Sequence, residues 1–111
     1  MKLSQNATIA PLKLTQYLLQ YQPQDDKSLF LAKAGYTIAN WQQLEQDLRS
    51  QILVLEAIPT RKTQFGQKYE IRGTLRGTNG KELAIVTIWM IETETSETKF
   101  ITLLPDKENR T

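Results

Sequence analysis

The sequence contains no cysteine and no histidine among its 111 residues. Without cysteine there are no disulfides, thiolate nucleophiles or thiolate metal ligands. This composition is typical of a reducing compartment, so we expect a cytoplasmic protein. Without histidine the chain lacks the side chain whose unperturbed pKa lies nearest neutrality, which is also the commonest metal ligand. Any proton transfer must therefore use lysine, tyrosine, glutamate or aspartate.

Long apolar runs and glycine-rich loops are also missing from the sequence. No run approaches the roughly 20 apolar residues that cross a bilayer, and residues 1–10 lack the basic start and apolar stretch of a secretory signal. The glycines match neither the G-x-x-x-x-G-K-S/T nor the G-x-G-x-x-G phosphate-binding pattern. We therefore expect no membrane association and no nucleoside triphosphate hydrolysis.

The charges are nearly balanced, with 14 Lys+Arg against 12 Asp+Glu and a net charge of +2. That excess is too small to identify a nucleic-acid binder from its overall field. The acidic residues give no metal site either, because Asp25 and Asp26 resemble helix caps and Glu92, Glu94 and Glu97 fall in a predicted turn. We expect neither a metal nor another cofactor.

What the sequence does contain is the composition of one folded domain. It has 40% hydrophobic and 23% charged residues, which is ordinary globular usage, and its length suits a single hydrophobic core. We predict an ordered domain over residues 9–105. The polar segments 1–8 and 106–111 are predicted to be flexible termini.

Apolar spacing and capping residues predict three short helices in the first half. The first covers residues 14–21 and stops before Pro23, and the second runs from an N-cap at residue 25 or 26 to Gly35. The third opens at Thr37. Its apolar stripe, which should lie on the sheet, contains Trp41, Leu44 and Leu48.

From Ile52 onward, β-branched and aromatic residues broken by glycine and asparagine predict four strands. They are placed near residues 53–64, 67–77, 81–92 and 98–105. Pro59 cannot donate a ladder hydrogen bond, so the first strand should be an edge strand or contain a bulge. The sequence thus predicts an α+β fold in which short helices pack on one face of an antiparallel meander.

The dipeptide Asn79-Gly80 predicts a two-residue type I′ turn, because that turn needs positive φ at both central residues. Thr78 then pairs with Lys81, and this register separates the side chains into two faces. One face is wholly apolar and should cover the helices. Its pairs are Leu75–Ala84, Gly73–Val86, Ile71–Ile88 and Tyr69–Met90.

The opposite face gathers residues that suit chemistry on RNA. It contains Lys68, Glu70, Arg72, Thr74, Thr87 and Trp89, and Phe100 and Thr102 of the last strand could join it. Its cations could hold phosphates, Trp89 could stack on a base, and Glu70 could take a proton from a ribose 2′-hydroxyl. The alternative is the solvated face that an antiparallel sheet needs, with Trp89 covered by a ligand, a partner or a helix.

Two further cations, Lys13 and Lys27, lie beside the predicted starts of the first two helices. The positive end of a helix dipole disfavours a cation there unless a phosphate is nearby. The alternative is that both are ordinary exposed lysines that serve solubility.

Motifs over residues 12–105 resemble a small bacterial domain family of unknown function. They are Lys13-Leu14-Thr15-x-Tyr17-Leu18-Leu19, Lys27-Ser28-x-Phe30-Leu31-x-x-x-Gly35, Trp41-x-x-Leu44, Gly66-x-Lys68-Tyr69-x-Ile71-x-Gly73-x-Leu75-x-Gly77, Val86-Thr87-Ile88-Trp89 and Thr102-Leu103-x-Pro105. Members occur as stand-alone proteins, often in cyanobacteria, and as C-terminal domains of polymorphic toxins. The resemblance therefore implies a toxin-like role. The candidate site residues that it offers are Lys13, Thr15, Lys27, Thr87, Trp89 and Thr102.

The predicted order of helices and strands is also similar to the barnase, colicin and RelE-like ribonuclease toxins, by analogy of architecture. Barnase relies on a histidine, which this sequence lacks. Some toxins of related architecture instead cleave RNA with lysine, arginine and tyrosine, by electrostatic stabilisation of the transition state. Only that mechanism is available to this chain.

We therefore predict a toxin-like, metal-independent endoribonuclease with RNA as its substrate. The predicted catalytic residues are Lys13, Lys27, Glu70, Arg72, Thr87 and Thr102, and the predicted nucleic-acid-binding residues are Lys68 and Trp89. The alternative is a non-catalytic interaction module, an immunity or antitoxin-like partner that docks through the Trp89 face. A small antitoxin or immunity protein is the expected partner, and a homodimer could form through an edge strand.

Overall fold

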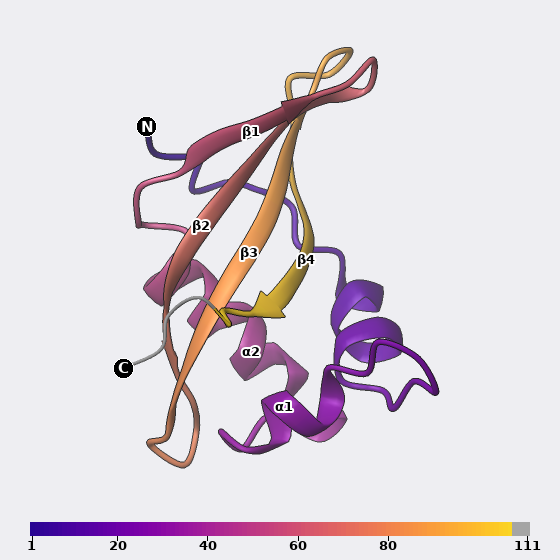
Figure 1. Cartoon of the computed structure of the whole chain (residues 1–111), viewed down its shortest axis with the longest axis vertical. Coiled ribbons are helices and arrows are strands. Elements are labelled where there is room, and N and C mark those ends of the chain that lie inside the picture. Colours follow the sequence, from indigo (N-terminus) through magenta and orange to yellow (C-terminus); the bar gives the residue numbers. More distant parts are fainter. Residues whose placement is uncertain (108–111) are drawn as a thin grey trace.

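Helical segments occupy the first half of the chain and strands occupy the second half (Figure 1). The structure is a computed structural model of the whole chain, and it describes residues 1–107. The helical elements are η1 (Lys13–Leu18), α1 (Ser28–Ala32), η2 (Ile38–Asn40), α2 (Trp41–Asp47) and η3 (Leu48–Ile52). The strands are β1 (Ile58–Lys62), β2 (Gly66–Arg76), β3 (Glu82–Glu92) and β4 (Thr98–Pro105).

The strands form one antiparallel sheet in the order β1-β2-β3-β4, and the helical elements lie on one side of it (Figure 1). This arrangement confirms the predicted α+β meander. β1 is an edge strand whose register is irregular between Pro59 and Lys62, as expected from the missing N–H of Pro59. It begins later than predicted because η3 continues the helical half of the chain as far as Ile52.

Local side-chain chemistry sets the helix boundaries much as the sequence predicts. Gly35 follows α1 with φ of 91°, which glycine adopts without strain. Thr37 and Asn40 form a capping box, in which the Thr37 N–H donates to Asn40 Oδ1 at 2.8 Å. Asp26 accepts a hydrogen bond from the Leu29 N–H at 3.2 Å and so caps the first turn of α1, although the N-cap position itself is Lys27.

The predicted register of the β2–β3 hairpin is wrong by one residue. Leu75 pairs with Leu83 and Ile71 pairs with Thr87. The loop holds three residues, 78–80, because Asn79 keeps a negative φ and only Gly80 takes a positive one, at 85°. The Gly77 N–H closes the loop by donating to the Lys81 carbonyl oxygen at 2.9 Å. The extra loop residue reverses the two faces of β3.

Contacts with α1 explain why the longer loop forms. Thr78 Oγ1 donates to the Gly35 carbonyl oxygen and Asn79 Nδ2 donates to the Lys33 carbonyl oxygen, each at 3.0 Å. A Cβ atom at Gly77 would overlap with the backbone of Ala34. The hairpin tip therefore satisfies carbonyl groups that the C-terminal end of α1 leaves without helical partners.

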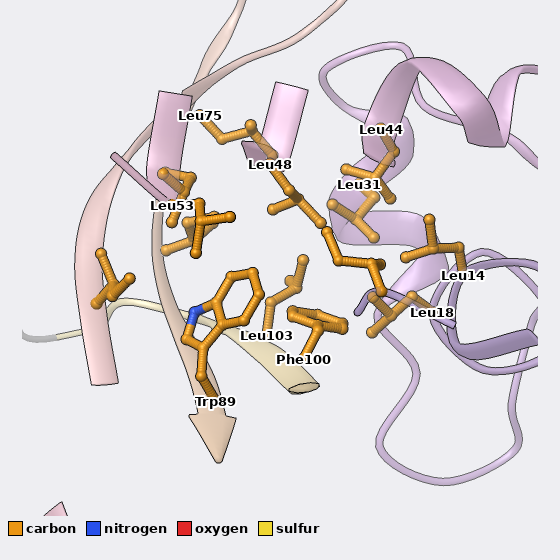
Figure 2. Close-up of a cluster of buried hydrophobic side chains, with 14 of the residues drawn as sticks. Leu14, Leu18, Leu31, Leu44, Leu48, Leu53, Leu75, Trp89, Phe100 and Leu103 are labelled. Atoms are coloured by element: carbon orange, nitrogen blue, oxygen red, sulfur yellow. The ribbon is translucent and has the colours of Figure 1, made fainter. Parts of the chain in front are cut away.

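The reversed faces bring Trp89 into the centre of the core, where it is fully buried (Figure 2). Its ring packs edge-to-face on Phe100, with ring centroids 5.2 Å apart. Its indole Nε1–H donates to Thr87 Oγ1 at 2.7 Å, and the Thr87 hydroxyl donates to the Ile71 carbonyl oxygen at 3.2 Å. The surrounding side chains include Leu14, Leu18, Leu31, Leu44, Leu48 and Leu103.

Residues 1–8, which the sequence predicts to be a flexible terminus, make contacts with the rest of the chain. Leu3 and Ala7 are buried in the core, and so is Ile9 just beyond them. The Thr8 N–H donates to the Thr98 carbonyl oxygen, and the Phe100 N–H donates to the Thr8 carbonyl oxygen, each at 2.8 Å. The segment thus covers part of the edge of β4.

Of the other predicted flexible segment, residues 106–111, positions 108–111 lie outside the described part of the chain. The Asp106 N–H donates to the Ala84 carbonyl oxygen at 2.9 Å, so pairing with β3 continues past the end of β4. Within residues 1–107, no helix has the length and apolar character needed to cross a membrane.

We predict that Thr87→Val destabilises the fold by about 1–3 kcal/mol, because it leaves the buried indole N–H of Trp89 without an acceptor. The measurement is the free energy of unfolding in urea. Thr74→Val, the same change at an exposed position of β2, is the matched control and should alter stability by no more than about 0.5 kcal/mol. Equal losses in both variants would contradict the buried hydrogen bond.

Candidate functional site

Three of the predicted site residues, Lys13, Lys27 and Thr102, meet around a tyrosine that the sequence analysis left unassigned. Tyr17 and Lys13 lie four residues apart in η1. Lys27 precedes α1, and Thr102 lies on β4. Because η1 packs against β4, segments far apart in the sequence come together here (Figure 1). We call these four residues the Tyr17 cluster.

Lys27 contacts both the hydroxyl group and the ring of Tyr17. Lys27 Nζ donates to the Tyr17 hydroxyl oxygen at 3.1 Å and lies 4.9 Å from the centroid of the Tyr17 ring. Lys13 Nζ lies 5.8 Å from the same centroid. Lys27 is only 8% exposed, whereas Tyr17 is 40% exposed. A nearly buried lysine therefore holds the hydroxyl group of a tyrosine that is itself partly exposed.

This arrangement lowers the pKa of the Tyr17 phenol below its ordinary value of 10.0. The hydrogen bond from Lys27 is the main cause, and the nearby Thr102 hydroxyl acts in the same direction. Partial burial raises the pKa, and the charges of Lys27 and Lys13 lower it further. The net result is a tyrosine that loses its proton more readily than a free one.

The loop between η1 and α1 is held in shape by the Asp26 carboxylate. Its Oδ1 accepts hydrogen bonds from the Gln22 N–H at 2.9 Å and from the Ser28 hydroxyl at 2.7 Å. These bonds, together with the cap on Leu29, close the loop on both sides of Lys27. They lower the pKa of Asp26 even though desolvation opposes them. Asp26 thus helps to fix the position from which Lys27 reaches Tyr17.

Bulging in β4 shapes the other side of the cluster. The β3–β4 register pairs Trp89 with Phe100 but Ile88 with Thr102, so one extra residue is accommodated in β4. Phe100 and Leu103 can then both enter the core while Thr102 stays only partly buried. Without the extra residue, strict alternation would place Phe100 and Leu103 on opposite faces.

Lys68, Glu70 and Arg72 lie on the face of β2 that the helices do not cover, as predicted. Arg72 Nε lies 3.3 Å from Glu70 Oε1, and Arg72 Nη1 lies 2.8 Å from Asp106 Oδ1. The pairing with Asp106, followed by that with Glu70, raises the pKa of Arg72. Glu70 pairs with Ile88, which pairs with Thr102, so β2 is separated from the Tyr17 cluster by about 10 Å of sheet.

The prediction that Thr87 and Trp89 share this open face is wrong, because both are fully buried on the helix side. Their polar groups bond to each other and to Ile71. A base cannot stack on Trp89 in the folded protein. Thr15 also bonds internally, since its hydroxyl donates to the Pro11 carbonyl oxygen at 3.2 Å.

A family model described as Domain of unknown function (DUF6883) matches residues 2–107. The chain belongs to the DUF6883 family. Neither the curated proteins nor the solved structures gave a match. The match confirms the predicted membership of a domain family of unknown function.

No candidate metal centre occurs in the described part of this DUF6883 domain, where no three acidic side chains come together as ligands. The chemistry that the Tyr17 cluster can perform is proton transfer at the phenol and binding of an anion by two ammonium groups. Tyr17 stands in the same short motif as Lys13. The available sequence signal was therefore a tyrosine one helical turn from a lysine, in a chain without histidine.

We predict that Lys27→Met raises the pKa of Tyr17, because it removes the hydrogen bond that chiefly lowers it. The pKa can be measured by NMR from the pH dependence of the Tyr17 ring carbon shifts. Lys33→Met removes an exposed lysine outside the cluster and should leave the titration unchanged. An unchanged Tyr17 titration in folded Lys27→Met would show that the contact has no electrostatic effect.

Proposed function

We propose that this DUF6883 domain is a toxin-like, metal-independent endoribonuclease whose general base is Tyr17. The observation that supports this most is the 3.1 Å contact between the ammonium group of Lys27, a nearly buried residue, and the hydroxyl group of Tyr17, an exposed one. A phenol with a lowered pKa beside two lysines can take the place of histidine in proton transfer. This substitute is needed because the chain contains no histidine.

The reaction would be an internal transesterification of RNA. The Tyr17 phenolate accepts the proton of a ribose 2′-hydroxyl, and the resulting 2′-oxygen attacks the adjacent phosphorus. The bond from phosphorus to the 5′-oxygen breaks as the new bond forms. The products are a 2′,3′-cyclic phosphate and a free 5′-hydroxyl end. DNA would not react because it lacks the attacking hydroxyl group.

The two lysines have different roles in this scheme. Lys27, held at the phenol and nearly buried, stabilises the negative charge that gathers on the phosphate oxygens in the transition state. Lys13 is more exposed and donates a proton to the departing 5′-oxygen. Thr102 lies beside the phenol and helps to position it.

The open face of the sheet provides a path for the rest of the RNA strand. Lys68 and Arg72 of β2 bind neighbouring phosphates by electrostatic attraction, even though Arg72 is already paired with carboxylates. Glu70 maintains the orientation of Arg72 in this scheme and takes no proton. Thr87 and Trp89 do not contact RNA in this scheme and contribute only by stabilising the core.

A second candidate function, a protein-interaction module, is favoured by apolar side chains on the same open face. Ile88 and Met90 of β3 are only partly buried, and Ile58 of β1, which lies across Glu70 of β2 from Ile88, is 55% exposed. An antitoxin or immunity protein could cover them. A homodimer through β1 is disfavoured because its exposed edge carries Arg61 and Lys62, which would repel a second copy.

We predict that Tyr17→Phe abolishes RNA cleavage and growth inhibition in an induced bacterial host while the melting temperature stays nearly unchanged. Tyr21→Phe removes another exposed tyrosine hydroxyl and should retain full activity. Cleavage is read from RNA fragments on a gel and from the chemistry of their ends. Intact RNA with the wild-type chain, or equal cleavage by Tyr17→Phe, would exclude Tyr17 as the general base.

We also predict a specific pH dependence of the cleavage rate. Below the pKa of Tyr17 the phenol is protonated and inactive as a base, so the rate rises with pH and levels off before pH 10.0, the ordinary phenol value. In Lys27→Met the residual activity should level off at a higher pH. A profile that is identical in both proteins would point to a different general base.

A further inference from the structure

An open pocket of about 640 Å³ adjoins the Tyr17 cluster. It is lined by Asp25, Asp26, Lys27, Leu104, Pro105 and Lys107. Lys27 belongs to both, since its ammonium group bonds to Tyr17 while the residue lines the pocket. The volume lies within the range of small-molecule sites, and one nucleotide fits within it. A substrate phosphate at Tyr17 would therefore place an attached nucleoside beside this pocket.

The pocket lining is mixed in charge, and this limits what it can bind. Two carboxylates beside two lysines would repel a bare phosphate about as much as they attract it. A molecule with an anionic end and a hydrogen-bond-donating end satisfies both sets of groups. Leu104 and Pro105 add an apolar surface on which the flat face of a ring can lie. A nucleotide has all three features.

The two carboxylates are not equivalent. Asp26 already accepts hydrogen bonds from Gln22, Ser28 and Leu29, which occupy both of its oxygens. Asp25 is exposed, and its carboxylate has no hydrogen-bond or ion-pair partner within residues 1–107. Asp25 is therefore the acceptor in this pocket that is available to a ligand.

We propose that this pocket binds a guanine base and that Asp25 reads it. A carboxylate only accepts hydrogen bonds, and guanine presents two adjacent donors, N1–H and N2–H, that match its two oxygens. Adenine and uracil lack that pair. The inference rests on the proposed function, because the phosphate of the same nucleotide lies at Lys27 and Tyr17. The enzyme would accordingly cleave next to guanosine.

The test uses ligands that the protein cannot cleave. Guanosine 3′-monophosphate, inosine 3′-monophosphate, which lacks the N2 amino group, and inorganic phosphate are titrated into the full chain and followed by NMR. We expect guanosine monophosphate to bind about tenfold more tightly than inosine monophosphate. In Asp25→Asn this ratio should fall to about one, while inorganic phosphate should bind at least as tightly as before, because one repelling carboxylate is gone. Asparagine tolerates the φ of 54° at this position.

Glu94→Gln removes a carboxylate outside the pocket and should keep the guanine preference. Equal affinities for the two nucleotides in the wild-type chain, or a preference that survives Asp25→Asn, would overturn the inference. RNA cleavage without any base preference would overturn it and leave the ribonuclease proposal intact. A guanine preference that depends on Asp25, in a chain that leaves RNA uncut, would support the pocket and contradict the ribonuclease proposal.

Discussion

The burial of Trp89 against Thr87 and Phe100 is the constraint on which the rest of the structure depends. A large indole can lie in the core only if its N–H finds an acceptor, and the Thr87 hydroxyl, two residues earlier on the same face of β3, provides one at 2.7 Å. This pair fixes which face of β3 points inward. It also determines the alignment of β4, because Phe100 must meet the indole ring while Leu103 enters the core beside Thr87. The bulge in β4 and the exposure of Thr102 follow from that alignment.

The location of the Tyr17 cluster is a consequence of this packing. The core takes Leu14 and Leu18 of η1, so the residues between them face outward along β4. Asp26 closes the following loop and directs Lys27 back toward Tyr17. The residues proposed for catalysis are thus separate from those that stabilise the fold. The Trp89 indole and Thr87 hold the sheet together, while the Tyr17 phenol and Lys27 lie at the junction of η1, α1 and β4.

The sequence predicted features that one or two neighbouring residues determine, such as helix ends and the edge strand. It did not predict the β2–β3 register, which depends on contacts between elements distant in the sequence. Gly35, the Thr37 capping box and the edge position of Pro59 all follow from local chemistry.

The Asn79-Gly80 dipeptide was compatible with either a two-residue or a three-residue loop, and contacts with α1 decided between them. Those contacts are not visible in the sequence. The predicted register was therefore wrong by one residue, and Trp89 was assigned to the wrong face of β3. The burial of Leu3 and Ala7 likewise depends on a core that residues distant in the sequence build. Lys13, Lys27 and Thr102 were predicted as site residues from their motif positions. Their common neighbour Tyr17 could be singled out only from the three-dimensional arrangement.

We propose that RNA is cleaved at the Tyr17 cluster and that β2 only binds neighbouring phosphates of the RNA. The most direct measurement is an amide NMR titration with a 2′-O-methyl RNA oligonucleotide, which has no hydroxyl to attack and cannot be cleaved. The largest shift changes should occur at Lys13, Tyr17, Lys27 and Thr102, with smaller changes on β2. Changes confined to the open face around Lys68 and Arg72, or no changes at any position, would contradict the account.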